Sequence, residues 1–533
     1  MKKTISILLT IATIAILIPA ILFLPSCNSD MPDTMLVWAL PYTWGGPPGA
    51  PLIEEWERAV ARAIRERGGN FGVQILTVGS LSNNTFFANP HDAVYPWFTE
   101  LMIDEINNGT QIDISFVSSN DTTDAYLKMY QEGLTLQLCD FLQSDAGQEI
   151  YNIFPPVIWD AMRINGEVHG FFSPDVNFGT VAGYSICKNI ANEMDTSLLS
   201  SDLVEFANLY FENNIIFNPL SLSSKNALFF DMTELLPGVV LADGEITAFF
   251  EHYLLNRYFS GLYNIPRQTF WFETPHDVDS ILANTYILFS TSTEETIIDN
   301  DYIFYPISET NVSSITSAIT INPNSDLIEE ALQLLTWLHT DKEFANIFTY
   351  GEEGVHIRYE DGMMFNLLNP ARYEGEDGYI EEFSTNIASL IGTLYIATPP
   401  YFGEWGDARG LAETLLNRYW TFESAPHTGF RFNARGWEDK IDEFESVFND
   451  YRLVICPNWY ENHEQIAERF PERDWSNDPI FRPSPLAMGT DPDWETTLAN
   501  LNADLRAAGI GELIEEVQRQ YDEWFALHSP VNR

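Results

Sequence analysis

The first 27 residues constrain where this chain can fold more than any other segment does. Lys2 and Lys3 are followed by an apolar run from Ile5 to Leu24, and Cys27 stands shortly after the run ends. A basic start, an apolar stretch and a short cleavage site are the parts of an export signal. We therefore expect the remainder of the chain to fold outside the cytoplasm.

Cys27 makes this signal more specific. The sequence Leu24-Pro25-Ser26-Cys27 is similar to the lipobox of bacterial lipoproteins, although Pro25 is a less usual residue there. The resemblance implies that a diacylglycerol is joined to the Cys27 sulfur and that the signal peptide, residues 1–26, is removed. The alternative is an uncleaved membrane anchor, because the apolar run approaches the roughly 20 residues that a spanning helix needs. A polar tether, residues 27–34, precedes the folded part.

Length and charge limit the classes of fold and partner. About 500 residues follow the tether, which is more than one simple core usually contains, so two or more lobes are expected. The net charge is −50, from 77 acidic and 27 basic residues. Nucleic acid is not an expected partner, because phosphate binding needs a basic face. The same charge disfavours an anionic ligand.

Cysteine usage predicts neither a metal site nor a disulfide framework. Cys139, Cys187 and Cys456 remain after the lipobox cysteine, and their spacing fits no metal site. Because three is an odd number, at most one disulfide can form. We expect free, buried thiols and no cofactor.

The beginning of the folded part predicts a βαβ unit. Residues 35–40 have the pattern of a buried strand, and residues 54–67 carry apolar side chains at helical spacing before Gly68-Gly69. Residues 73–78 are a second predicted strand. A strand, a helix and a strand in this order favour a parallel sheet and the α/β class.

Later segments give three further local predictions. Asn165-Gly166 predicts a two-residue hairpin turn between short strands. Residues 318–321 predict a strand, which precedes a helix with an apolar stripe that begins at Leu327. Two helices separated by Gly509 are expected at the C-terminus.

Four segments carry motifs that occur together: Trp159 to Gly170, Ile319 to Trp337, Tyr350 to His356, and Ala507 to Trp524. They resemble, in order, the W-D-x-x-x-x-D-G-K-x-Y-G hairpin, the I-N-x-x-S-x-x-x-E-A-L-x-x-L-x-W strand and helix, the Y-G-x-E-G-x-H turn and the closing A-A-G … E-x-Q-x-Q-x-D-x-W of one family. That family is the bacterial extracellular solute-binding proteins of the carbohydrate type, related to the maltose-binding protein. The chain is most similar to the longer lipoproteins of this group, which carry a C-terminal extension.

The resemblance has limits. Asn165 stands where the family usually has Asp, and His169 stands where it usually has Tyr. Residues 200–300 and 465–488 show no local match.

The resemblance implies an α/β, two-lobed, periplasmic-binding-protein-like fold with hinge crossings and a C-terminal helical extension. Residues 35–173 and 301–354 would form the first lobe, and residues 174–300 and 355–533 the second. The crossings would fall near residues 173–175 and 301–308, and the ligand would lie in the cleft between the lobes.

A sugar site needs flat aromatic side chains for the CH faces and polar side chains for the hydroxyl groups. Such residues occur after the first strand, around the two expected crossings, and in two aromatic segments. The candidate ligand-binding residues are Tyr42, Trp44, Asp175, Asn177, Phe178, Tyr184, Trp271, Ser290 and Trp405. The alternatives are ordinary loop packing for Trp44, turn capping for Asp175 and Asn177, and core packing for the other aromatic residues.

The sequence does not favour an enzyme. His463-Glu464 begins like a zinc-protease motif, but Ala467 occupies the position of the second zinc ligand. Gly183-Tyr184-Ser185 lacks the glycine that a nucleophile elbow needs after the serine.

The resulting hypothesis is a monomeric, lipid-anchored receptor that binds an oligosaccharide-like solute reversibly and delivers it to the permease subunits of an ABC importer. The alternatives are a receptor for peptides or other solutes, a surface-anchored glycoside hydrolase with two catalytic carboxylates, and an adhesin without a transporter.

Overall fold

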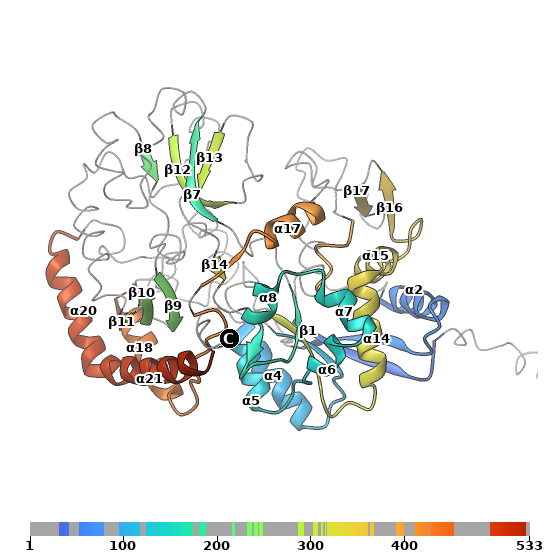
Figure 1. The fold of residues 1–533 in the computed structure, drawn as a ribbon, viewed down its shortest axis with the longest axis horizontal. Helices are drawn as coiled ribbons and strands as arrows, with labels where there is room; N and C mark the ends of the chain where they lie inside the picture. Colours follow the sequence, from blue (N-terminus) through green and yellow to red (C-terminus); the bar gives the residue numbers. More distant parts are fainter. Residues whose placement is uncertain are drawn as a thin grey trace, which may run out of the picture.

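The computed structural model describes 19 parts of the chain, which contain the elements labelled in Figure 1. They are residues 31–41, 53–78, 95–117, 124–173, 181–187, 216–218, 232–236, 239–242, 245–248, 286–292, 302–306, 311–312, 315, 317–360, 363–366, 391–398, 411–425, 427–451 and 491–528.

A five-stranded sheet organises the first part of the chain. Its strand order is β2-β1-β3-β15-β6. Strand β1 is parallel to both β2 and β3, whereas β15 is antiparallel to both β3 and β6. The bounds are β1 Met35–Pro41, β2 Gly72–Val78, β3 Ile114–Val117, β6 Phe171–Phe172 and β15 Ala318–Ile321.

The predicted βαβ unit is confirmed. Helix α2, Ile53–Glu66, joins β1 to β2 and contacts β2. Gly68 has a φ of 86°, in the left-handed region that ends many helices. The buried side chains of α2 include Trp56, Val60 and Ile64, which recur at helical spacing.

Helices enclose the first sheet, and together they form its core (Figure 1). Their bounds are α4 Tyr95–Asn107, α5 Ala125–Gln131, α6 Cys139–Leu142, α7 Asp145–Tyr151, α8 Pro156–Ala161, α14 Ile328–Thr340 and α15 Lys342–Tyr350.

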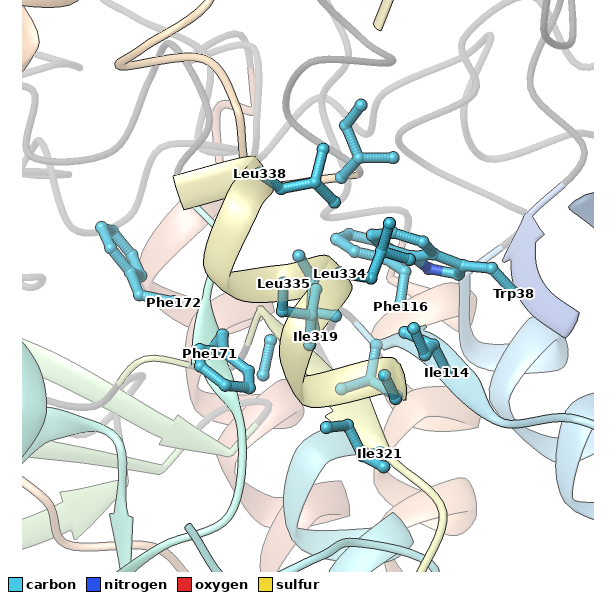
Figure 2. Close-up of a cluster of buried hydrophobic side chains, with 14 of the residues drawn as sticks. Trp38, Ile114, Phe116, Phe171, Phe172, Ile319, Ile321, Leu334, Leu335 and Leu338 are labelled. Carbon is cyan, nitrogen blue, oxygen red and sulfur yellow. The ribbon is translucent and has the colours of Figure 1, made fainter. Parts of the chain in front are cut away.

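Helix α14 supplies the centre of this core. Its buried Leu334, Leu335 and Leu338 lie in one cluster with Trp38 of β1, Phe171 and Phe172 of β6, and isoleucines of β3 and β15 (Figure 2). Strands β3 and β15 are buried along their whole length, as expected for strands in the middle of a sheet that is covered on both faces. The strand and helix predicted after residue 318 are therefore confirmed.

The predicted hairpin is also confirmed. Strands β4, Arg163–Ile164, and β5, Glu167–Val168, are antiparallel. Asn165 and Gly166 between them have φ values of 52° and 87°. A two-residue turn of this hand requires positive φ at both central residues, and Asn-Gly is the dipeptide that adopts it most readily.

A second sheet is separate from the first in hydrogen bonding. It has the order β13-β7-β12-β8 and stands apart from the first sheet in Figure 1. A three-stranded antiparallel sheet, β9-β10-β11, lies beside the C-terminal helices. The bounds are β7 Val181–Cys187, β8 Ile216–Asn218, β9 Met232–Leu236, β10 Val239–Ala242, β11 Glu245–Ala248, β12 Tyr286–Ser292 and β13 Tyr302–Pro306.

The chain passes twice between the two large sheets. It leaves the first sheet after β6 and enters the second at β7. It returns between β13 and β15, and β14, Asn311–Val312, lies on this return. Strand β14 is paired in parallel with β18, Glu423–Ser424. The outgoing crossing leaves after Phe172, next to the predicted residues 173–175. The return crossing begins only after Pro306, later than predicted from residues 301–308, because β13 belongs to the second sheet. The numerical lobe boundaries remain predictions.

The chain also comes back to the first core after residue 390. Ile391, Leu394 and Tyr395 belong to the core cluster of the first sheet, as do Leu415 and Tyr419 of α17, Leu411–Tyr419. Our division assigns residues 355–533 to the second lobe, but these described side chains pack with the first. Strands β16, Ile357–Glu360, and β17, Met363–Asn366, form a hairpin before this return.

The C-terminus contains the predicted helical pair. Helices α20, Trp494–Ala508, and α21, Ile510–His528, are separated by Gly509, whose φ is 96°. Helix α18, Glu438–Asp450, contacts α20, and α21 contacts β11. None of the helices within the described residues is long and apolar enough to span a bilayer.

Leu335→Ala tests the central position of α14. The substitution leaves a cavity at a fully buried site, so we expect the free energy of unfolding to fall by about 2–5 kcal/mol. Denaturant unfolding followed by tryptophan fluorescence measures this. Leu527→Ala is the matched control: Leu527 is 74% exposed, and its loss is expected to change stability by no more than about 0.5 kcal/mol. Equal effects would show that α14 is not a core element.

Candidate functional site

The strand register brings three connections to one edge of the first sheet. Strand β6 is parallel to β1, because both β3 and β6 are antiparallel to β15. Val117 at the end of β3 and Phe172 at the end of β6 are level with Ala318 at the start of β15. The loop after β1, the outgoing crossing and the return crossing therefore all meet this edge. Open α/β sheets bind ligands at the carboxyl ends of their strands.

The candidate residues named from the sequence relate to this edge through the chain order. The loop with Tyr42 and Trp44 directly follows β1, and Asp175, Asn177 and Phe178 lie in the outgoing crossing between β6 and β7. These five residues, together with Trp271, Trp405 and Cys27, lie outside the described residues. Their roles remain predictions.

Two candidates lie in the second sheet. Tyr184 of β7 is opposite Phe289 of β12 and Tyr305 of β13. Ser290 of β12 is opposite Gly183. Tyr184 and Ser290 therefore lie on neighbouring strands of one sheet, and β7 is the strand that the outgoing crossing enters. Their contact with a ligand remains a prediction.

A buried group of aromatic rings packs against β6 near the edge of the first sheet at which β1, β3 and β6 end. We call this edge the carboxyl edge. His339 of α14 stacks between Phe171, at a centroid distance of 5.7 Å, and Tyr395, at 5.9 Å. Its Nδ1 is hydrogen-bonded to the Tyr395 hydroxyl. Burial lowers the pKa of His339 to about 4, so the ring is neutral at physiological pH. Gly392 packs against this group, and a Cβ there would lie 2.9 Å from Ile319 of β15.

Arg431 fixes the return crossing to the first lobe. Its guanidinium donates hydrogen bonds to the carbonyl oxygens of Ala161, at the end of α8, and of Ile315, just before β15. It also forms an ion pair with Asp124 and lies 5.0 Å from the centroid of the Tyr126 ring. The backbone amide of Ile315 donates to the Ala161 carbonyl, at 3.1 Å. Arg431 therefore holds three segments together that are far apart in the sequence.

Sequence reasoning did not identify Arg431 or His339. Their partners lie on other segments, so no local spacing marks them. The residue type gives no signal for Arg431 either, because the sequence contains 20 arginines. Among the described residues, no group of three or more His, Cys, Asp or Glu side chains is arranged to hold a metal ion.

Two solved structures are similar to this chain over almost its whole length. One is the N-glycan transport solute binding protein (NgtS) from Streptococcus pneumoniae, with 14% identity, a TM-score of 0.56 and coverage of 93% of this chain and 99% of that one. The other is the same protein in complex with Man1GlcNAc, with 15% identity, a TM-score of 0.52 and coverage of 93% and 100%. The chain has the two-lobed solute-binding-protein fold. Its predicted fold class is therefore confirmed.

The C-terminal extension of this solute-binding fold has its own sequence match. Residues 483–526 match the family described as Domain of unknown function (DUF3502). Comparison with curated proteins finds no similar sequence. The matched segment contains α20 and most of α21, so the family match and the helical pair are the same feature.

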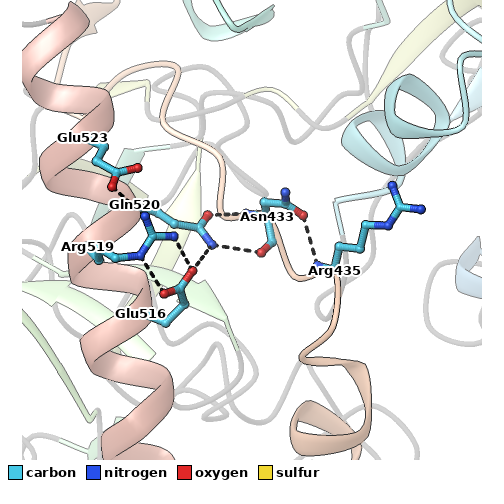
Figure 3. A network of polar contacts seen from close by, with 6 residues as sticks. All are labelled: Asn433, Arg435, Glu516, Arg519, Gln520 and Glu523. Atoms are coloured by element: carbon cyan, nitrogen blue, oxygen red, sulfur yellow. Dashed lines mark hydrogen bonds and ion pairs between the residues drawn. The ribbon is translucent and has the colours of Figure 1, made fainter.

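Helix α21 is attached to the segment that carries Arg431. The backbone N–H of Asn433 donates to Gln520 Oε1 at 2.8 Å, and Gln520 Nε2 donates back to the backbone carbonyl of Asn433 at 3.1 Å (Figure 3). Gln131 of α5 donates to Asn433 Oδ1 at 2.8 Å. Phe430 meets the rings of Tyr521 and Trp524 at centroid distances of 5.1 and 5.7 Å.

These contacts explain part of the closing motif. Gln520 and Trp524, two of its residues, lie against the segment around residue 430 and connect the extension to the first lobe. Glu516 and Glu523 hold Arg519 next to Gln520 on the exposed side of the helix (Figure 3). Hydrogen bonds from Arg519 and Gln520 lower the pKa of Glu516 to about 2.

Arg431→Met tests the tie between the return crossing and the first lobe. The Arg431 side chain is 3% exposed, and its loss leaves the partly buried Asp124 carboxylate without its ion-pair partner. We expect a loss of about 3–5 kcal/mol in the free energy of unfolding, measured by denaturant unfolding. Arg519→Met is the matched control, because that side chain is 52% exposed and water screens its ion pairs, so we expect little change in stability. Similar losses in both variants would contradict the assignment.

His339 gives the protein a defined pH dependence. Its folded pKa of about 4 lies below the ordinary 6.5, so its contribution is complete above pH 6.5 and is lost as pH falls toward 4. His427, also with a pKa near 4 because of burial, acts in the same direction. His339→Phe keeps an aromatic ring and removes one titratable side chain. Between pH 7.5 and 5, we expect the variant to lose about 2 kcal/mol less stability than the wild type. Identical pH profiles of unfolding would refute this.

Proposed function

We propose that this protein is the substrate-binding component of an ABC importer and that it binds an uncharged oligosaccharide between its two lobes. The observation that carries the proposal is the meeting of both crossings and the loop after β1 at one edge of the first sheet. A molecule bound there contacts the segments that change orientation when the lobes move.

The fold comparison supports the ligand class. The similar Streptococcus pneumoniae protein is named for N-glycan transport, and one of its structures contains Man1GlcNAc. The residues next to the edge have the matching chemistry: Tyr42 and Trp44 offer flat faces, and Asp175 and Asn177 offer partners for hydroxyl groups. The net charge of −50 disfavours an anionic glycan.

The proposed mechanism is a shift between open and closed arrangements of the lobes. A ligand that touches both lobes binds the closed form more tightly, and this difference in affinity drives closure. No covalent chemistry is involved. Arg431 keeps the end of the return crossing at Ile315 attached to the first lobe.

The proposal includes the cellular position of the protein. The lipobox supports cleavage before Cys27 and attachment of the monomeric receptor to the outer face of the cell membrane by a lipid. The permease subunits of the importer are the proposed protein partners, and they receive the closed, loaded form.

A ligand screen tests the proposal. A soluble form that begins after Cys27 is heated with neutral N-glycan fragments, other neutral oligosaccharides and peptides. A glycan at 100 times its dissociation constant stabilises the folded state by about 2.7 kcal/mol. We therefore expect a rise in melting temperature of several degrees, at about 2–4 °C per kcal/mol.

The same samples separate the alternatives. Intact glycan after incubation agrees with a receptor, whereas the release of new reducing ends identifies a glycoside hydrolase. Stabilisation by peptides alone would replace the sugar with a peptide as cargo. Binding of glycans without any permease genes beside this gene would favour an adhesin over an importer component.

A further inference from the structure

Trp420 is an exposed aromatic residue on a firmly packed segment. Its side chain is 56% exposed, whereas its neighbour Tyr419 is completely buried and Phe422 is almost so. The Tyr419 and Phe422 rings are 5.7 Å apart between centroids. The backbone on both sides of Trp420 is therefore anchored in the core, and the indole is exposed at the surface.

This segment lies at the carboxyl edge of the first sheet. The Tyr419 ring packs edge-on against Phe172, the last residue of β6, at a centroid distance of 5.7 Å. Phe172 is level with Ala318, where the chain re-enters the sheet. The residue before Trp420 in the chain, Tyr419, thus contacts the end of the strand from which the outgoing crossing departs.

The return crossing is equally close. Glu423 and Ser424 form β18, which pairs with Asn311 and Val312 of β14 on that crossing. Three residues of chain from Trp420 to Glu423 span at most about 10 Å. In Figure 1, β14 is drawn between the four-stranded sheet and α8, and α17 is drawn to its right, above α8. The chain neighbours of Trp420 therefore contact the strand from which the outgoing crossing departs and the β14 strand of the return crossing.

The surroundings of Trp420 have the composition of a sugar subsite. An indole offers a broad apolar face to the CH groups of a pyranose, and Glu423 and Ser424, both exposed, offer partners for hydroxyl groups. A single exposed apolar side chain needs no explanation by itself. An exposed indole on an anchored backbone segment, beside exposed polar groups and near the ends of β6 and β14, is a more specific arrangement.

We propose that Trp420 is an aromatic platform on which a sugar ring of the ligand stacks. This inference rests on the proposed oligosaccharide-binding function and adds to it a contact that the sequence patterns did not single out. It also assigns to residues 411–424 a place in the binding site, because α17 and β18 position the indole.

The test compares three variants of the protein. Trp420→Ala removes the platform, Trp420→Phe keeps a smaller aromatic face, and Phe525→Ala removes the other exposed aromatic side chain of the described residues, 38% exposed on α21. Affinity for a glycan found in the ligand screen is measured by isothermal titration calorimetry. Melting temperatures of the free proteins show whether each variant is folded.

We expect Trp420→Ala to weaken glycan binding about 5- to 30-fold, as for a contact worth one or two kcal/mol. Trp420→Phe should recover part of that loss, and Phe525→Ala should bind within about twofold of the wild type. If the wild type binds a glycan and Trp420→Ala binds it equally well, this inference is wrong and the proposed function stands. Equal losses in Trp420→Ala and Phe525→Ala would also overturn it. If the wild type binds no glycan, the proposed function fails and the platform fails with it.

Discussion

The pairing of β15 between β3 and β6 is the constraint on which the rest of the structure depends. It completes the first sheet with a strand that the chain supplies only after visiting the second sheet. Its antiparallel register sets β6 parallel to β1, so the outgoing connection leaves from the edge at which β1 ends and β15 begins. The leucines of α14 then cover the completed sheet. The proposed site lies where the ends of β1 and β6 and the start of β15 come together.

Polar contacts between residues far apart in the sequence also stabilise the attachment of the return crossing to the first lobe. Arg431 places one cation among carbonyl groups from α8 and from the return crossing, with Asp124 as its counter-ion. A buried charge is tolerated only when it is paired and hydrogen-bonded in this way. The reciprocal hydrogen bonds of Asn433 and Gln520 extend the same attachment to α21. The C-terminal extension is thus part of the support of the first lobe.

Sequence patterns predicted the elements whose causes are local. The βαβ unit, the Asn165-Gly166 turn, the segment from β15 to α14 and the helices around Gly509 all follow from periodicity or from backbone preferences within a short window. The return of Ile391 to Tyr395 and of Tyr419 to the first core has no such local cause. Arg431, His339 and Trp420 escaped prediction for the same reason, because only the fold reveals their neighbours. Most of the predicted ligand contacts lie outside the described residues, so they stay predictions.

The late arrival of β15 has a consequence for biosynthesis. Ribosomes and export channels deliver the chain from its N-terminus, and β6 has no partner in the first sheet until residues 318–321 have emerged. Arg431, which donates a hydrogen bond to the Ile315 carbonyl on the return crossing, emerges later still. Contacts of such high sequence separation form slowly. A chain with this topology therefore remains without a completed first lobe during most of its synthesis, which is the state that the proposed export through a narrow translocation pore requires.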